Sequence, residues 1–139
     1  MSFIKWFEIP VEDLQRAVAF YSNVFRVSFE IQDFSGIRHA IFKKEHEELN
    51  LSGALVEIGK FNNEQIGPIL FFDANSGMTD IIDQIIENGG EVLLKKTLIR
   101  NVTVDGSFII PKTLIDGETG YFSYVMDSEG NKLGLYSNS

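Results

Sequence analysis

Few side chains in this sequence of 139 residues can do covalent or acid–base chemistry. Cysteine is absent, which excludes disulfides, thiolate nucleophiles and cysteine-ligated metal centres. Histidine occurs only as His39 and His46, so a three-histidine metal site is excluded and a Ser–His–Asp site would have to use one of these two. Gly89-Gly90 follows a predicted helix, whereas the glycines of phosphate-binding loops precede one, so a nucleotide fingerprint is absent.

Glu8 is the candidate general base. It lies in an apolar run over residues 3–9 (FIKWFEI), which predicts a strand, and it follows Trp6 by two residues, on the same strand face. A carboxylate in an aromatic cavity is suited to proton abstraction. The alternative, favoured for a single acid without an evident partner, is a carboxylate at the rim of a cleft or in a salt bridge.

The two histidines are weaker candidates. His39 lies in a predicted strand beside Arg38 and Ala40, and we expect a surface-strand histidine rather than a polar residue of a cleft. His46 lies in the acidic run over residues 45–48 (EHEE), which predicts a solvated loop. No second histidine follows at the spacing of a zincin motif.

Composition and charge exclude several classes of partner. The net charge is −8, from 12 basic and 20 acidic residues, and no basic stripe is present, so neither nucleic acid nor an anionic membrane is an expected partner. No apolar run approaches the roughly 20 residues of a bilayer span, and the start has no signal-peptide pattern, so we expect a cytoplasmic protein. Twelve phenylalanines predict an aromatic core or an aromatic-lined cavity.

Two amphipathic helices are predicted between β-rich runs. Asp13 can cap the first helix, because its carboxylate accepts free backbone N–H groups. Asn75-Ser76 can cap the second helix, and the run over residues 88–90 (NGG) ends it. Apolar residues recur with helical period at Leu14, Ala17, Val18, Tyr21, Val24 and Phe25, and again at Met78, Ile81, Ile82, Ile85 and Ile86. Strands are predicted over residues 3–9, 27–34, 37–43, 53–58, 67–73, 91–97, 121–126 and 132–136.

The element order βαβββ therefore occurs twice, with an offset of about 64 residues. This predicts an α+β fold in which two βαβββ modules, residues 1–66 and 67–139, form a curved, cleft-enclosing mixed sheet with helices outside. The two modules are expected to make one structural domain. Residues 101–119 break the symmetry, and this long loop could serve as a lid or a dimer contact. Asp105-Gly106 within it predicts a small hairpin.

Several motifs in this order support a family resemblance. They are residues 7–21 (FEIPVEDLQRAVAFY), 89–93 (GGEVL), 120–122 (GYF) and 126–135 (MDSEGNKLGL). With its duplicated layout, the chain resembles the glyoxalase/bleomycin-resistance/extradiol-dioxygenase proteins, the vicinal oxygen chelate superfamily, over nearly its whole length. Arg26 departs from the pattern, because the family often has a glycine where the first helix ends.

The resemblance implies a divalent metal held by four side chains on strands that face a cleft. Carried over, the first, third and fourth ligand positions fall on Trp6, Pro68 and Gly134, and the second falls within residues 52–56 (SGALV). Indole, proline and glycine side chains donate no lone pair to such a cation. We therefore predict that the usual metal site is absent and expect no cofactor.

The leading hypothesis is a metal-free small-molecule binding protein with an aromatic-lined cleft, similar to the bleomycin-binding members of the family. Its ligand is expected to be a small apolar or aromatic molecule, and the resemblance implies a homodimer whose cleft uses both chains. Trp6 is interpreted as a stacking platform or as a plug of the vestigial site. The expected ligand-binding residues are Trp6, Glu8, Pro68, Leu70, Phe72, Gly134 and Tyr136.

Two other hypotheses remain open. One is an enzyme: a divergent metal-dependent lyase or dioxygenase with ligands from Glu8, Glu57 and His39, or a metal-free acid–base catalyst that uses Glu8. The other is a non-catalytic interaction module whose cleft has collapsed around its own phenylalanines. Leu70 and Phe72 share a predicted face with Pro68 and belong either to the cleft or to the core.

Overall fold

The computed structural model describes residues 4, 6–34, 36–43, 52–59 and 67–139, and its element order confirms the predicted duplication. The first module contains β1 (Trp6–Val11), α1 (Leu14–Phe25), β2 (Phe29–Phe34), β3 (Ile37–Phe42) and β4 (Ser52–Glu57). The second contains β5 (Phe71–Asp73), α2 (Met78–Glu87), β6 (Glu91–Leu98), β9 (Tyr121–Met126) and β10 (Lys132–Ser137), with the short strands β7 (Asn101–Val102) and β8 (Phe108–Ile109) inserted. The fold is α+β, as predicted.

The two modules have matching sheets. Their strand orders are β1-β4-β3-β2 and β5-β10-β9-β6, and in each sheet the first pair is parallel while the other pairs are antiparallel. The prediction of one curved sheet needs a correction here. Each module has its own four-stranded sheet, because β1 and β5 are both edge strands and no ladder of the described residues joins them.

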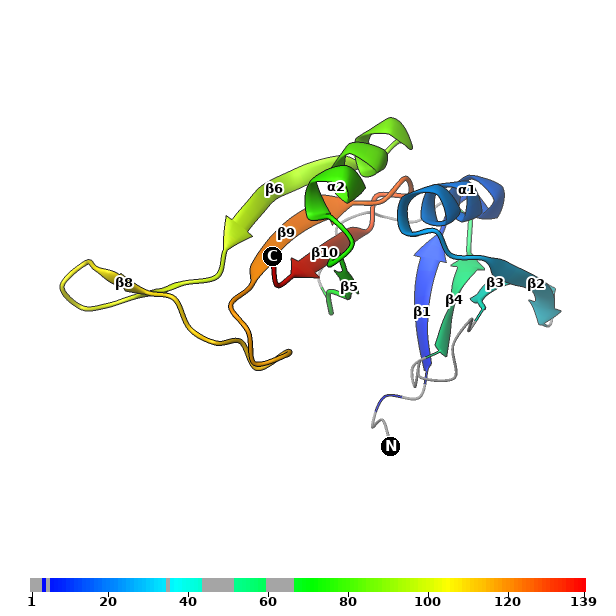
Figure 1. The fold of residues 1–139 in the computed structure, drawn as a ribbon. Helices are drawn as coiled ribbons and strands as arrows, with labels where there is room; N and C mark the ends of the chain where they lie inside the picture. Colours follow the sequence, from blue (N-terminus) through cyan, green and yellow to red (C-terminus); the bar gives the residue numbers. More distant parts are fainter. Residues whose placement is uncertain (1–3, 5, 35, 44–51, 60–66) are drawn as a thin grey trace.

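Both helices lie on the same side of the molecule, and a single core joins the modules (Figure 1). Leu14, Tyr21 and Val24 of α1 are buried with Ile81 and Ile85 of α2, as their helical spacing predicts. Ile86 differs from the prediction, because it is 56% exposed at the edge of that face. We call the face of each sheet that is turned away from this core its open face. None of the described helices is long and apolar enough to cross a membrane.

The ends of the helices are built differently in the two modules. Asp13 caps α1 as predicted, accepting a hydrogen bond of 3.0 Å from the backbone N–H of Arg16. The residue before α2 is Gly77, without a side-chain cap, so the predicted cap by Asn75-Ser76 is wrong. The side-chain oxygen of Asn75 instead accepts the N–H of Asn138 at 2.8 Å.

Glu129, in the turn between β9 and β10, binds the first module where β1 leads into α1. Its carboxylate accepts the N–H groups of Glu12 and Asp13 at 3.1 and 2.9 Å and pairs with the Arg16 guanidinium at 2.6 Å. Burial alone would raise the pKa of Glu129, but these hydrogen bonds, with Arg16 foremost, hold it below its usual value. The ionised carboxylate therefore ties the two modules together.

A second contact between the modules is buried. The hydroxyl of Tyr21 donates a hydrogen bond of 2.6 Å to Asp127, and both residues are almost inaccessible. Asn131 donates one hydrogen bond to Asp127 at 3.0 Å and another to the carbonyl of Pro10 at 2.8 Å. Burial raises the pKa of Tyr21 well above its usual value and also raises that of Asp127. We call Tyr21, Asp127 and Asn131 the buried latch.

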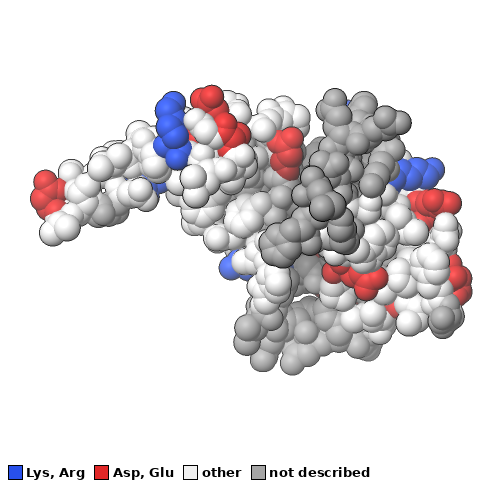
Figure 2. Space-filling view, turned by 90° about the horizontal axis from the view of Figure 1, so that it is seen from below, with Lys and Arg blue, Asp and Glu red and all other residues white. Residues whose placement is uncertain are grey.

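The inserted segment between β6 and β9 projects from the body of the molecule (Figure 1). β7 and β8 pair in it as a hairpin, as Asp105-Gly106 predicts, with Gly106 at φ +87°. Figure 2 shows this arm as a mainly uncharged projection with acidic atoms near its end. Val104, Phe108 and Leu114 are exposed along it, so its apolar side chains have little cover in this chain.

Candidate functional site

The open face of the first sheet carries a polar cluster of Trp6, Glu8 and His39. Ile9 and Val11 of β1 are buried in the core, so the alternating residues Trp6 and Glu8 lie on the open face, as predicted. The indole N–H of Trp6 donates a hydrogen bond of 3.0 Å to Oε2 of Glu8. His39 Nε2 lies 3.7 Å from the same oxygen.

The strand between β1 and β3 explains how the side chains of Glu8 and His39 meet. β4 separates the two strands, and it places Ala54 opposite Glu8 and Val56 opposite His39. The Glu8 side chain therefore meets His39 across β4, and Ala54, the small residue of β4 that pairs with Glu8, is fully buried.

His39 is more enclosed than a surface-strand histidine, because its side chain is only 12% exposed. Its Nδ1 lies 3.0 Å from the carbonyl oxygen of Ile37, and its ring meets the Phe34 ring edge-on at 4.9 Å. A sequence signal was available: Ile37, His39 and Ile41 alternate with the buried Ala40, so the histidine belongs to the open face. His46 lies outside the described residues.

Glu57 is not part of this cluster. It lies at the end of β4 and accepts hydrogen bonds from the Arg38 guanidinium at 3.0 Å and from the N–H of Leu14 at 2.8 Å. The hydrogen bond from Arg38, followed by that from Leu14, lowers the pKa of Glu57. The alternative ligand set of Glu8, Glu57 and His39 is therefore not assembled, because Glu57 is engaged at the start of α1.

The positions that the resemblance assigns to a metal do not offer a suitable donor set. Leu55 and Leu135, both buried, pair with Ile9 and Phe72, so the residues before them, Ala54 and Gly134, occupy corresponding places on the two open faces. Neither has a donor atom in its side chain, and Trp6 presents an indole N–H.

Gly134 is also closed to any larger side chain. A Cβ atom at Gly134 would collide with the ring of Phe71, which lies over the glycine from the neighbouring strand. Among the residues that the structure describes, no group of three or more His, Asp or Glu side chains could hold a metal ion. The family's metal therefore does not fit the residues at these positions.

Two adjoining cavities lie at the seam between the modules. The first, of about 370 Å³, brings together three of the predicted residues, Glu8, Pro68 and Leu70. The second, of about 330 Å³, contains the predicted Leu70 and Phe72 and is mostly aromatic. Phe7 and Leu70 line both, so we call the pair the seam cavities. Lining residues of the second cavity are Phe7, Phe25, Val27, Phe42, Lys43, Leu70, Phe71, Phe72 and Asp73.

Phe72 reaches this seam from the core side of β5. Its ring stacks on Phe25 at 4.6 Å and contacts Tyr21 at 6.1 Å, while the neighbouring Phe71 faces Tyr124 at 5.8 Å. Both alternatives for Leu70 and Phe72 are thus combined, since each packs on the core and also lines a cavity. Four other lining residues were not predicted, although the phenylalanine content indicated such a cavity: Phe7, Phe25, Phe42 and Phe71.

Tyr136 is separate from the seam cavities. Its hydroxyl donates a hydrogen bond of 2.8 Å to Asp116 and lies 3.0 Å from the Thr113 hydroxyl, which anchors the base of the arm on β10. The pKa of Tyr136 is raised, first by burial and then by the contact with Asp116. The pKa of Asp116 is lowered, first by the hydrogen bond from the N–H of Glu118 and then by that from Tyr136.

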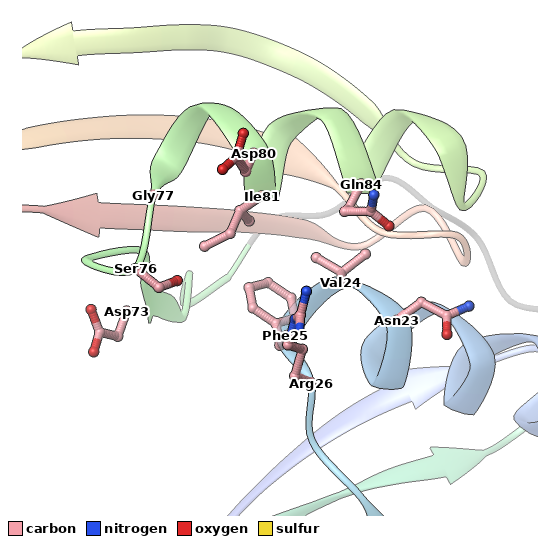
Figure 3. A pocket seen from close by; sticks show the side chains of 10 residues that line it. All are labelled: Asn23, Val24, Phe25, Arg26, Asp73, Ser76, Gly77, Asp80, Ile81 and Gln84. Carbon is pink, nitrogen blue, oxygen red and sulfur yellow. The ribbon is translucent and has the colours of Figure 1, made fainter.

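A third cavity, of about 410 Å³, lies between the end of α1 and the start of α2 (Figure 3). Its walls mix Arg26 with Asp73 and Asp80, around the apolar Phe25 and Ile81. Arg26 has a left-handed backbone, with φ 55° and ψ 41°, at the position where the family often has glycine. None of the predicted site residues lies in this cavity.

Comparisons with known proteins give the class of fold. No family model and no curated protein matches the sequence. The fold, however, matches solved structures. A glyoxalase I mutant from Zea mays superposes with a TM-score of 0.69 at 15% sequence identity, and the match covers 96% of this chain and 45% of that one. The fosfomycin resistance protein FosX from Listeria monocytogenes, complexed with Mn(II) and sulfate, has a TM-score of 0.61 at 15% identity, with 99% and 93% covered.

A glyoxalase-related enzyme from Fulvimarina pelagi matches with a TM-score of 0.63 at 13% identity, over 99% of this chain and 89% of that one. At such identities the likeness concerns the fold. This chain therefore shares the fold of these glyoxalase and fosfomycin-resistance structures, which is the fold that its sequence motifs predicted.

Proposed function

We propose that this protein binds a small apolar or aromatic molecule in the seam cavities and does so without a resident metal ion. The observation that carries the proposal is the aromatic cavity of about 330 Å³, to which both modules contribute phenylalanines. That volume is in the range of small-molecule sites, and ring edges and faces suit flat apolar ligands. The fold itself is shared with both enzymes and binding proteins, so it does not choose between them.

The donor set supports the metal-free form of this proposal over a divergent lyase or dioxygenase. Trp6, Ala54 and Gly134 replace ligating side chains, and Glu57 is held away from Glu8 by Arg38 and Leu14. Elemental analysis of tag-free protein dialysed against Mn(II) or Zn(II) tests it. We expect less than about a tenth of a metal ion per chain, whereas a near-stoichiometric value would favour the metalloenzyme.

Binding can be tested with the uncharged fluorophore N-phenyl-1-naphthylamine. We expect saturable binding at one site per chain, lost in Val27→Trp, since Val27 lines the aromatic cavity and a larger ring there would fill it. Ile31→Trp is the matched control, because Ile31 is 54% exposed on the edge strand β2 and does not line the cavity. Binding that survives Val27→Trp unchanged would place the ligand elsewhere and contradict the proposal.

We also infer a homodimer in which apolar residues of the open faces contact a second copy, beside a cleft that stays open to ligands at Glu8. Phe34, Ile37 and Phe71 are each more than two-fifths exposed on these faces, which is unusual for the surface of a monomer. Sedimentation equilibrium tests the inference. The inference is supported if the wild-type protein is a dimer and the Ile37→Glu variant is a monomer that keeps the wild-type melting temperature at high protein concentration. A wild-type protein that is monomeric at micromolar concentration would contradict it.

A further inference from the structure

Glu8 connects the polar cluster of the open face to a cavity that is otherwise mainly apolar. It lines the seam cavity of about 370 Å³ together with Phe7, Pro68 and Leu70. Its side chain is 49% exposed, so ligands can reach the carboxylate without a rearrangement of the core. A single carboxylate at the wall of an apolar cavity provides direction and charge selectivity for whatever enters.

The described residues around Glu8 leave two hydrogen-bond acceptors without a donor from this part of the chain. The carbonyl of Ile37 accepts only, so the Nδ1 atom of His39 that faces it at 3.0 Å must carry the proton. In the neutral ring Nε2 is then an acceptor, and it lies 3.7 Å from Oε2 of Glu8. Oε2 is bound by the Trp6 N–H, whereas Oε1 accepts no hydrogen bond from the described residues. A donor placed between Oε1 and Nε2 would satisfy both.

The charge of Glu8 is also poorly compensated. The arginines of the described ion pairs bind Glu129 and Glu57, and the only ion pair that the described residues give Glu8 is the one with His39, at 3.7 Å. Lys132 lines the same cavity, but its Nζ lies over the ring of Tyr124, 4.4 Å from the centroid. The Trp6 indole beside Glu8 is 42% exposed and adds a π-face that attracts cations.

We propose that the ligand of this site carries a protonated amine on its apolar or aromatic body. The amine binds Glu8 Oε1 and His39 Nε2 beside the Trp6 ring, and the apolar body occupies the seam cavity. This inference rests on the proposed binding function and adds the charge of the ligand to it. The net charge of −8 works in the same direction, since it raises the local concentration of cations.

Three probes of one shape and different charge test the proposal: benzylammonium, toluene and benzoate. Isothermal titration measures each affinity, and the fluorescence of Trp6, the only tryptophan of the chain, reports whether a probe binds near Glu8. We expect benzylammonium to bind most tightly. Glu8→Gln retains the acceptor for the Trp6 N–H but removes the charge, and should weaken benzylammonium by about tenfold or more while toluene is unaffected.

Glu30→Gln is the matched control. Glu30 lies on the edge strand β2, does not line the cavity, and its replacement removes the same unit of charge. An equal loss in both variants would mean a long-range effect of net charge and would overturn the proposed contact. The comparison of the three probes on the wild-type protein does not depend on how well any variant folds.

The remaining outcomes separate this inference from the function on which it rests. Equal affinities for benzylammonium and toluene would overturn the amine and leave apolar binding intact. Tighter binding of benzoate would overturn it in favour of an anion held by Lys132. If none of the three probes binds or changes the Trp6 fluorescence, both the inference and the proposed binding function fail for ligands of this class.

Discussion

The two modules share their strand order and differ on their open faces. In the first module this face carries the hydrogen-bonded group of Trp6, Glu8 and His39. In the second it carries a layer of rings, in which Tyr124 contacts both Phe71 and Phe122, and Phe71 lies over Gly134. One scaffold thus presents a polar open face and an aromatic one.

The difference shows what the fold constrains and what it leaves to the side chains. The ladder fixes which residues face away from the core, and this alternation is kept in both modules. The chemistry of those positions is not fixed by the ladder, because no core contact depends on it. A module can therefore lose ligating side chains while its buried face stays apolar.

The largest expected effect concerns the aromatic layer of the second module. Gly134→Ala places a Cβ against the Phe71 ring, and we expect a loss of about 2–3 kcal/mol in the free energy of unfolding. Urea denaturation measures it. The double variant with Phe71→Leu should recover a large part of the loss, and an unchanged stability of Gly134→Ala would mean that Phe71 moves freely.

A somewhat smaller effect is expected at the buried latch, which joins the modules. Tyr21→Phe removes the hydrogen bond to Asp127 and leaves that carboxylate buried with fewer donors, at a cost of about 2 kcal/mol. Thermal and urea unfolding check this value. Tyr124→Phe, on the open face, is the control and should change stability by less than about 0.5 kcal/mol. Similar losses in the two variants would show that the latch adds nothing specific.

The smallest expected effect is a gain in the free energy of unfolding, and it concerns the residues that follow the two helices. Gly89 follows α2 with φ +90°, whereas the residue after α1 is Arg26 with φ +55°. Only glycine adopts this region without strain, so Arg26→Gly should stabilise the protein by about 0.5–1 kcal/mol. Arg26→Ala, which keeps a Cβ, should give no gain. A loss of stability in Arg26→Gly would indicate that the arginine side chain makes a compensating contact in the cavity of Figure 3.

The sequence by itself determined the class of fold and the local elements. Helical period placed Leu14, Tyr21 and Ile85 on buried faces, and strand period placed Trp6 and Glu8 on one face. The absence of a donor at Gly134 was also readable, because it concerns residue type alone. These properties depend on residue types and on their spacing along the chain, and both can be read from the sequence.

Tertiary structure decided the contacts between distant segments. Whether His39 met Glu8 or solvent depended on β4 lying between β3 and β1, and the engagement of Glu57 depended on the start of α1. The seam cavities exist because Phe7 and Phe72 come from different modules packed around one core. Such contacts are set by the packing of whole elements, and period and residue type do not specify that packing.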